Sequence, residues 1–268
     1  MSENTGKLFI YSIIGFFAGL YFFYKGFQSL KLKRTIENMP TSTIRSLAIG
    51  FVELKGIALS YQELLKSKLI NNADQIPKEV LRSPFSQKEC VYYKYTIERY
   101  VRRDKSSYWE TVRQGTKGSY LVLKDKTGTV LVNLDKAEID VPLDKEYNSA
   151  LGVDPPTAVL NFIKINNIAY EGLFGMNYTM RYREYYIAPG DNLYILGTAG
   201  KNPFIKNIIN NEDGIMIQKG NNSIYYISEK AEKDIVSSMN WKTFGGIIGG
   251  AALSILCLTI ILFIVGLL

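Results

Sequence analysis

The residue types on which most protein catalysis depends are scarce in this sequence. None of the 268 residues is a histidine, and there are only two cysteines. Without histidine there is no Ser-His-Asp or Cys-His pair to activate a nucleophile. Two thiolates are also too few for a structural zinc site, which takes four cysteine or histidine ligands. We therefore expect no metal and no cofactor, and the composition leans away from an enzyme.

The two cysteines fall in different parts of the chain. Cys90 lies in a strand-like run, and Cys257 lies in a long apolar stretch. A disulfide between them would have to join a water-facing domain to the interior of a bilayer, so both are expected to be free thiols. Cys90 is interpreted as a small buried hydrophobic residue rather than as a reactive group.

The densest basic run is the main candidate for a binding surface. It holds Arg99, Arg102, Arg103 and Lys105, in a chain of formal net charge +7. A basic domain tethered at a bilayer would face anionic lipid headgroups, to which each nearby Lys or Arg contributes about 1 kcal/mol. A partner protein could use the same surface, or the run could be the solvated end of a strand. Nucleic acid is the weaker interpretation, because the many tyrosines fit a core and a membrane rim better than a base-stacking platform.

The carboxylates show no pairing with an evident catalytic role. Asp191 is expected to serve its own turn, and Glu184 to form a surface ion pair with Arg181 or Arg183. No glycine-rich phosphate loop is present, because the glycines of residues 245–250 are followed by apolar residues. The remaining candidates are expected to be solvated in loops: Asp125, Asp135, Glu138, Asp140, Asp144, Glu146 and Asp154.

Two uncharged apolar stretches, residues 8–24 and 244–268, are predicted to cross a membrane as helices. They have roughly 17 and about 25 residues, against roughly 20 needed to span the hydrocarbon core. An uncleaved anchor is favoured for the first, because no small-residue cleavage site follows it. The patterns Gly245-x-x-x-Gly249 and Gly246-x-x-x-Gly250 would let another helix approach closely, either the first span or a partner in self-association, although glycine is also common in membrane helices.

The charges beside the two spans predict which side the middle domain occupies. Lys25, Lys31, Lys33 and Arg34 follow the first span, and Lys242 precedes the second. The positive-inside rule therefore places the middle domain in the cytoplasm.

Between the spans the sequence predicts a β-rich domain over residues 40–240. Aromatic and β-branched residues dominate its most strand-like run, residues 90–101. Shorter strands are predicted at residues 51–58, 108–113, 119–123, 129–134, 178–187, 192–196, 214–218 and 223–227, and the turn at residues 124–128 predicts a hairpin.

Helical structure is predicted in four short segments of the same region. These are a juxtamembrane stub ending before Pro40, one or two turns within residues 61–80, a helix at residues 157–163 and a helix at residues 229–239 capped by Ser228. The fold class is thus membrane-anchored and mainly β (α+β), with a few short helices, flanked by two transmembrane helices. Short strands separated by turn residues indicate a small barrel or sandwich, and we expect a five-to-seven-stranded barrel of the OB or SH3 kind.

Four blocks of sequence carry a family resemblance. They are PTSTIRSLAIGFVELKG (residues 40–56), SPFSQKECVYYKY (83–95), REYYIAPGDNLYILGTA (183–199) and ISEKAEK (227–233). In this order they resemble the GIDE domain, also called the BAM or beside-a-membrane domain, of mitochondrial outer-membrane E3 ubiquitin ligases. The resemblance implies the same order of anchor, domain and anchor. It also implies a domain on the non-cytosolic side, against the charge rule that we follow.

The resemblance does not extend to the residues on which the ligase activity depends. In the ligases a RING finger follows the second span, and a RING needs eight cysteine or histidine ligands, whereas this chain stops at Leu268 within its second span. We therefore expect a non-catalytic interaction or scaffolding module at the bilayer, binding membrane lipids or a membrane protein. The alternative is a member or accessory subunit of an E3 ubiquitin ligase-like or membrane proteolytic system, with catalysis supplied by a separate chain.

Overall fold

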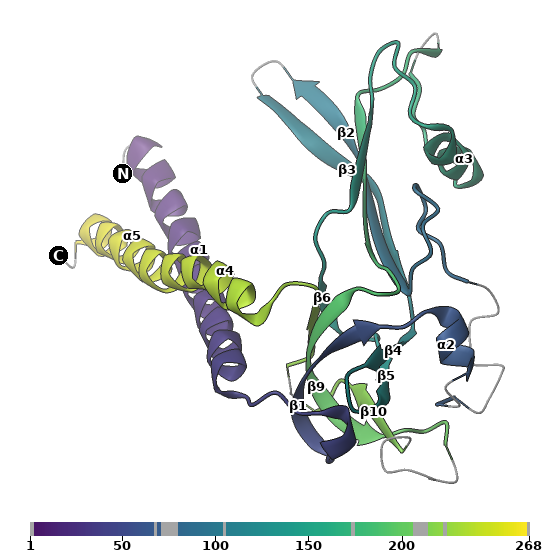
Figure 1. Ribbon diagram of the computed structural model, residues 1–268. Helices are drawn as coiled ribbons and strands as arrows, with labels where there is room; N and C mark the ends of the chain where they lie inside the picture. The colour runs from purple at the N-terminus through teal and green to yellow at the C-terminus, as the bar shows by residue number, and fades with distance from the viewer. Residues whose placement is uncertain are drawn as a thin grey trace. The chain divides into compact units, whose positions relative to one another are not determined.

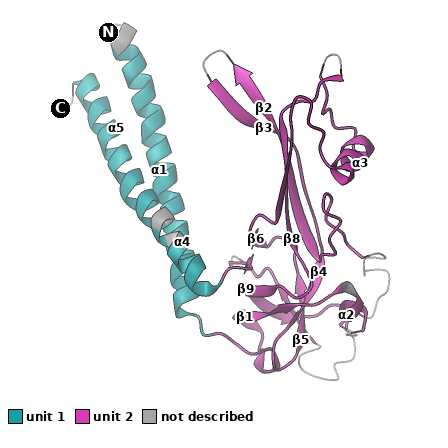
Figure 2. Cartoon of the chain, turned by 45° about the horizontal axis from the view of Figure 1, so that its top comes forward, with its two compact units in different colours: residues 1–40, 231–268 teal, residues 41–230 magenta. Residues whose placement is uncertain are grey.

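The computed structural model describes residues 3–66, 69–70, 80–103, 106–172, 175–205, 214–221 and 224–266. The chain divides into two compact units, which Figure 2 colours separately. One is helical and consists of Met1–Pro40 with Ala231–Leu268, and the other is β-rich and consists of Thr41–Lys230. Figure 1 labels most of the helices and strands.

The helical unit contains two long helical runs. The first is α1 (Glu3–Asn38), and the second joins α4 (Glu232–Phe244), a π-helical segment η4 (Gly245–Gly249) and α5 (Gly250–Val265). Two helical segments, Thr5–Asn38 and Gly245–Val265, are long and apolar enough to cross a membrane, where the sequence predicted spans. The predicted juxtamembrane stub is the continuation of α1, which ends before Pro40 because the residue preceding a proline is disfavoured in a helix.

One of the two glycine pairs lets the helices approach each other closely. A Cβ atom added to Gly250 would lie 2.7 Å from the carbonyl oxygen of Gly19 on α1, and Gly246 also faces α1 at similar range. Gly245 and Gly249 have no described atom within 4 Å of such a Cβ. The predicted approach of the first span to these glycines is therefore confirmed for Gly246 and Gly250 within the chain.

The β-rich unit is built on a closed five-stranded barrel. Its strands follow the order β1 (Gly50–Ala58), β4 (Tyr120–Lys124), β5 (Thr129–Asn133), β10 (Ile215–Gln218) and β9 (Asn192–Lys201), and β1 pairs with both β4 and β9 to close it. Only the β5–β10 pair of the barrel is parallel. This arrangement is an OB-type Greek-key barrel, so the predicted fold class is confirmed.

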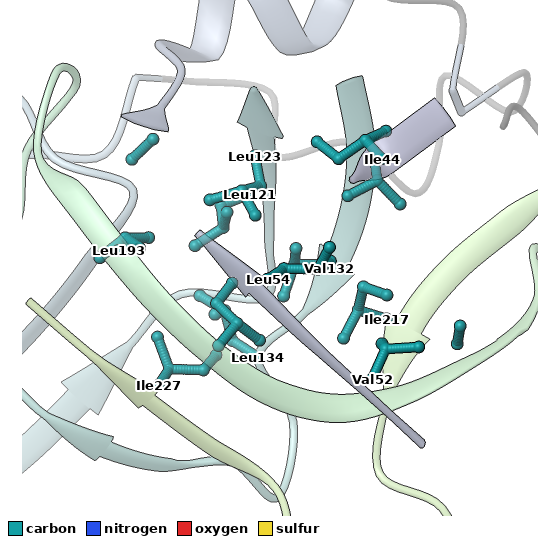
Figure 3. Packing of buried hydrophobic residues seen from close by; sticks show 14 of the residues in the cluster. Ile44, Val52, Leu54, Leu121, Leu123, Val132, Leu134, Leu193, Ile217 and Ile227 are labelled. Atoms are coloured by element: carbon teal, nitrogen blue, oxygen red, sulfur yellow. The ribbon is translucent and has the colours of Figure 1, made fainter. Parts of the chain in front are cut away.

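The barrel is filled by apolar side chains from all five strands. Leu54, Leu123, Val132, Ile195 and Ile217 are each 0% exposed and belong to one core cluster, most of which Figure 3 shows converging between the strands. Burying a side chain of this size stabilises the fold by about 1.5–3 kcal/mol. Closure also leaves no unpaired edge in the barrel, and β11 (Tyr226–Ser228) and β6 (Glu138–Asp140) extend its sheet beyond β9.

A second, four-stranded antiparallel sheet stands beside the barrel in the same unit. Its order is β3 (Ser106–Lys117), β2 (Tyr92–Arg103), β8 (Met180–Ile187) and β7 (Lys145–Ser149). Figure 1 shows the β2–β3 hairpin extending away from the barrel. The predicted strands are present, but the sequence did not predict that they form a separate sheet, nor that β7 completes it.

One face of the second sheet is covered. The helix α3 (Thr157–Ile165), predicted at this place, packs Val159 and Ile163 onto the sheet, where they join Ile97 and Tyr182. The ring of Phe85 meets those of Tyr95, Phe162 and Tyr182 edge-on at 5.4–6.1 Å, a favourable geometry for aromatic pairs. This face is therefore a second apolar core, separate from that of the barrel.

Two local predictions are wrong. Ser228 does not cap a helix: it lies in β11, where its hydroxyl donates to the Asp140 carbonyl, and α4 begins only at Glu232. The expected solvated loop carboxylates are also partly strand residues, because Glu138 and Asp140 lie in β6 and Glu146 lies in β7. The predicted helical turns after residue 60 are confirmed as α2 (Tyr61–Lys66); residues 67–68 and 71–79 lie outside the described chain.

Candidate functional site

The second sheet has one face that no described helix of its unit covers. Because side chains alternate along a strand, Ile97 is buried under α3 while its neighbours Thr96 and Glu98 point to the other side. We call this the open face, and all its residues are exposed or half-buried: Lys94, Thr96, Glu98, Tyr100, Arg102, Trp109, Thr111, Gln114, Thr116, Glu146, Asn148, Arg181, Arg183 and Tyr185.

Ion pairs order the centre of the open face. The guanidinium Nε of Arg181 lies 2.5 Å from Glu98 Oε2, and that of Arg183 lies 2.6 Å from Glu146 Oε2 and its Nη1 3.6 Å from Glu98. The hydrogen bond from Arg181 holds the pKa of Glu98 below its usual value, and the hydrogen bond from Arg183 does the same for the pKa of Glu146. Both carboxylates therefore stay ionised at neutral pH and hold the arginines in fixed orientations.

An aromatic pair adjoins these ion pairs. The Arg181 guanidinium lies 4.3 Å from the ring centroid of Trp109, within cation–π range, and the rings of Trp109 and Tyr100 meet edge-on at 5.3 Å. Tyr100 is 40% exposed. Tryptophan, tyrosine and arginine are the residue types that most often dominate the energy of protein–protein interfaces. Here Tyr100, Trp109 and Arg181 lie side by side on the neighbouring strands β2, β3 and β8.

Arg99, the first residue of the predicted basic run, lies on the other face of the sheet. Its guanidinium makes a 2.8 Å ion pair with Glu110 and stacks 5.2 Å from the ring centroid of Tyr178. Its charge is therefore balanced by a neighbour on β3, which weakens its attraction for an anionic lipid surface.

The rest of the predicted run does not form a single basic surface. Arg102 is exposed on the open face, whereas Arg103 lies on the opposite face with its guanidinium 5.9 Å from the ring centroid of Tyr108. Lys105 lies outside the described residues. Strand alternation thus separates side chains that are adjacent in sequence.

Two carboxylates, Glu184 in β8 and Asp191, accept hydrogen bonds from the backbone of turns. The predicted surface ion pair of Glu184 is wrong: this side chain is 0% exposed and accepts hydrogen bonds from the backbone N–H groups of Phe85 and Ser86 at 3.0 and 3.1 Å. It thereby fixes the turn that carries the Phe85 ring into the second core. Asp191 serves its own turn as predicted, since it accepts a 2.6 Å hydrogen bond from the N–H of Ala188.

The thiol of Cys90 lies in the interior of the β-rich unit. Cys90 is buried, free and 1% exposed, as predicted, and desolvation by burial raises the pKa of its thiol to about 12. A thiol that stays protonated at neutral pH is a poor nucleophile. Within the described ranges no three His, Cys, Asp or Glu side chains are grouped so that they could hold a metal ion.

Sequence reasoning missed Tyr100, Trp109 and Glu98, which form the centre of the open face. A signal for the two aromatic residues was available, because only two residues separate β2 from β3 and this spacing sets Tyr100 opposite Trp109. The partnership with Arg181 could not be found in this way, since β8 lies some 80 positions further along the chain and its register depends on tertiary packing.

Comparison with known proteins gives one match. No curated protein and no solved structure matches the chain. The sequence model of the GIDE family, described as an E3 ubiquitin ligase, matches residues 92–263, from the start of β2 into α5. The matched region includes the whole second sheet, most of the barrel and most of the second candidate span. It covers well over half of the 268 residues, and the chain therefore belongs to the GIDE family.

Proposed function

We propose that this chain is a membrane-anchored, non-catalytic interaction module whose open face binds a partner protein. The observation that carries the proposal is the cluster of Tyr100, Trp109 and Arg181, held in place by Glu98. A pre-ordered cluster of this kind loses little conformational entropy when a partner binds, which favours affinity. The two candidate spans would keep the module at the bilayer.

The charges of the open face favour a protein over a lipid surface. A patch for lipid headgroups would present cations without acidic neighbours, whereas here two glutamates pair with two arginines. The balance is four positive against two negative side chains, so a partner with a net acidic surface fits best: Lys94, Arg102, Arg181, Arg183, Glu98 and Glu146.

Site-specific photocrosslinking in native membranes tests the proposal. A photoreactive amino acid would replace Gln114, which is exposed on the open face, and in a second variant Ile165, which is 79% exposed at the end of α3. We expect a discrete crosslinked protein with the Gln114 variant alone, and its loss when Trp109→Ala is added. Equal crosslinking from both positions, or crosslinks to lipid alone, would contradict the proposal.

The family description favours a second candidate, an accessory subunit of a ubiquitin ligase system. In that case the protein held by the open face would be the chain that supplies ligase chemistry, because this chain has no histidine and two cysteines in 268 residues. The purified full chain, incubated with ubiquitin, E1 and a panel of E2 enzymes, should form no conjugates. Conjugates formed by this chain alone would refute the non-catalytic function, and conjugates that appear only with the crosslinked partner would favour the accessory role.

We also propose that the β-rich unit faces the cytoplasm. Lys25, Lys31, Lys33 and Arg34 on α1 follow the most apolar part of the first candidate span, which supports this sidedness. Gln114→Cys in a background without the two native cysteines would be labelled by a membrane-impermeant maleimide only after the cells are opened. Labelling of intact cells would reverse the assignment.

A further inference from the structure

A cavity of about 600 Å³ lies in the β-rich unit, away from the open face. It is formed where α2, the start of β2 and the β3–β4 connection meet β4. Its volume falls in the range of about 300–1,000 Å³ that is usual for small-molecule sites. Neither the basic run nor the open face accounts for it.

The wall of the cavity is apolar and close-packed. Leu64 and Val122 are at most 5% exposed and belong to the apolar cluster beneath α2, and Leu59 and Val91 are half-buried beside them. Such a wall binds hydrocarbon and excludes water.

Gly118 shapes one side of this wall. Its φ angle is +148°, and a Cβ atom there would lie 2.9 Å from the carbonyl oxygen of Val91 and 3.0 Å from Cα of Tyr92. Only glycine therefore lets the β3–β4 connection lie directly on the start of β2. The neighbouring thiol of Cys90 contributes no charge, because burial raises its pKa to about 12.

The charged residues that line the cavity are exposed to solvent, unlike its apolar wall. Arg82 and Lys117 are exposed, and no described lining residue is acidic. The cavity is thus apolar inside and cationic where it meets solvent. An apolar chain that ends in an anion satisfies both parts at once.

We propose that this cavity binds a single-chain anionic amphiphile, namely a long-chain fatty acid, with the acyl chain on the Leu64–Val122 wall and the carboxylate beside Lys117. Two candidate spans would hold the chain in a bilayer, which is a source of such amphiphiles. The inference does not depend on the partner protein of the open face.

Photolabelling of the full chain in phosphatidylcholine nanodiscs tests the inference. The probe is a palmitic acid that carries a diazirine on its acyl chain, and labelled peptides are identified by mass spectrometry. We expect labels within residues 59–64, 90–93 or 117–122, and at least tenfold less label there in excess oleate. Excess hexadecanol, which has no carboxylate, should compete weakly. Labels confined to α1 and α5, or equal competition by hexadecanol, would overturn the proposal.

Two variants distinguish the cavity from adventitious contact with lipid. Lys117→Glu reverses the charge at the opening and should reduce cavity labelling several-fold, whereas Lys126→Glu, in the exposed turn between β4 and β5, is the matched control. Leu59→Trp fills the cavity from a half-buried position and should abolish the label while thermal unfolding stays close to that of the parent. Undiminished labelling in both Lys117→Glu and Leu59→Trp would refute the site.

Discussion

The barrel and the second sheet bury their apolar side chains in different ways. The barrel closes on itself, so that Leu54, Ile195 and Ile217 are surrounded on all sides and no strand of the ring has a free edge. The second sheet has a covered face, where Ile97 and Tyr182 pack against α3, and an open face, where arginine and glutamate pairs take the place of a core.

This difference suggests that the barrel contributes mainly to stability and the open face mainly to the proposed binding. In the closed barrel the inward side chains pack against one another and supply stability. The second sheet has an apolar core on one side only, and under the proposed function the ordered side chains of its other side would contact a partner. Most of the free energy of folding should therefore come from the barrel and the α3 core, and most of the binding energy from the open face.

The largest expected effect separates the two regions directly. Leu54→Ala removes a fully buried side chain from the barrel and should lower the free energy of unfolding by about 2–5 kcal/mol. Trp109→Ala, on the open face, should change it by no more than about 1 kcal/mol. Urea unfolding of the full chain in detergent, followed by circular dichroism, measures both. Similar losses in the two variants would mean that the open face is part of a core.

A second comparison sets two glutamates on opposite faces of the second sheet. Glu184→Ala leaves the buried N–H groups of Phe85 and Ser86 without their acceptor and should cost about 2–4 kcal/mol. Glu146→Ala breaks a half-exposed ion pair with Arg183 and should cost at most about 1 kcal/mol. The same unfolding measurement checks the difference, and a larger loss for Glu146→Ala would reverse our reading of the two faces.

The pH dependence of the open face sharpens the comparison further. The hydrogen bond from Arg181 lowers the pKa of Glu98 from its usual value of 4.5, so the folded state binds this proton less readily than the unfolded state. The stabilisation is therefore fully present above about pH 5 and is lost as the pH falls through the lowered pKa. The difference in stability between the parent and Glu98→Gln, about 1 kcal/mol at pH 7, should vanish at pH 3. A constant difference from pH 3 to pH 7 would contradict the ion pair.

A last comparison concerns the junction of the two regions. Glu229 is partly buried near Asp191, which precedes β9, and Asp144, which precedes β7, and desolvation together with these carboxylates raises its pKa from 4.5 to about 7. The folded state then holds a proton that the unfolded state releases, so stability falls as the pH rises from about 4.5 to about 7. Glu229→Gln should remove this decline and raise the midpoint of thermal unfolding at pH 8. A lower midpoint for the variant at pH 8 would show that the charged form is stabilised instead.

Local sequence patterns were sufficient to predict most helices and strands, but not how the strands pair into sheets. The alternation around Leu54, the turn of residues 124–128 and the apolar stretches predicted β1, the β4–β5 hairpin and the two candidate spans, because each depends on neighbouring residues alone. The second sheet could not be predicted, since it joins β2 to β8 across some 80 residues. The short β7, Lys145–Ser149, lacks β-branched residues and is a strand because of its partner β8.

The candidate site could likewise be predicted only in part, because its residues come together through strand pairing. The arginines of residues 99–103 were visible as a charge cluster, but whether they act together depends on strand alternation, which places Arg102 on the open face and Arg99 with Glu110 on the other. Glu184 was misassigned for a related reason. A carboxylate that follows two arginines in the sequence suggests a surface pair, and only the fold reveals that its partners are the N–H groups of a distant turn.

The central claim is that the open face binds a partner protein, and affinity measured on single substitutions tests it most directly. With the partner identified by crosslinking at Gln114, its dissociation constant would be measured on the full chain in nanodiscs for the parent, Trp109→Ala and the control Ile165→Ala. We predict binding about 30-fold weaker for Trp109→Ala, as for an interface hot spot of 2 kcal/mol, and unchanged binding for the control. Equal affinity for the parent and Trp109→Ala, in variants that unfold alike, would contradict the account.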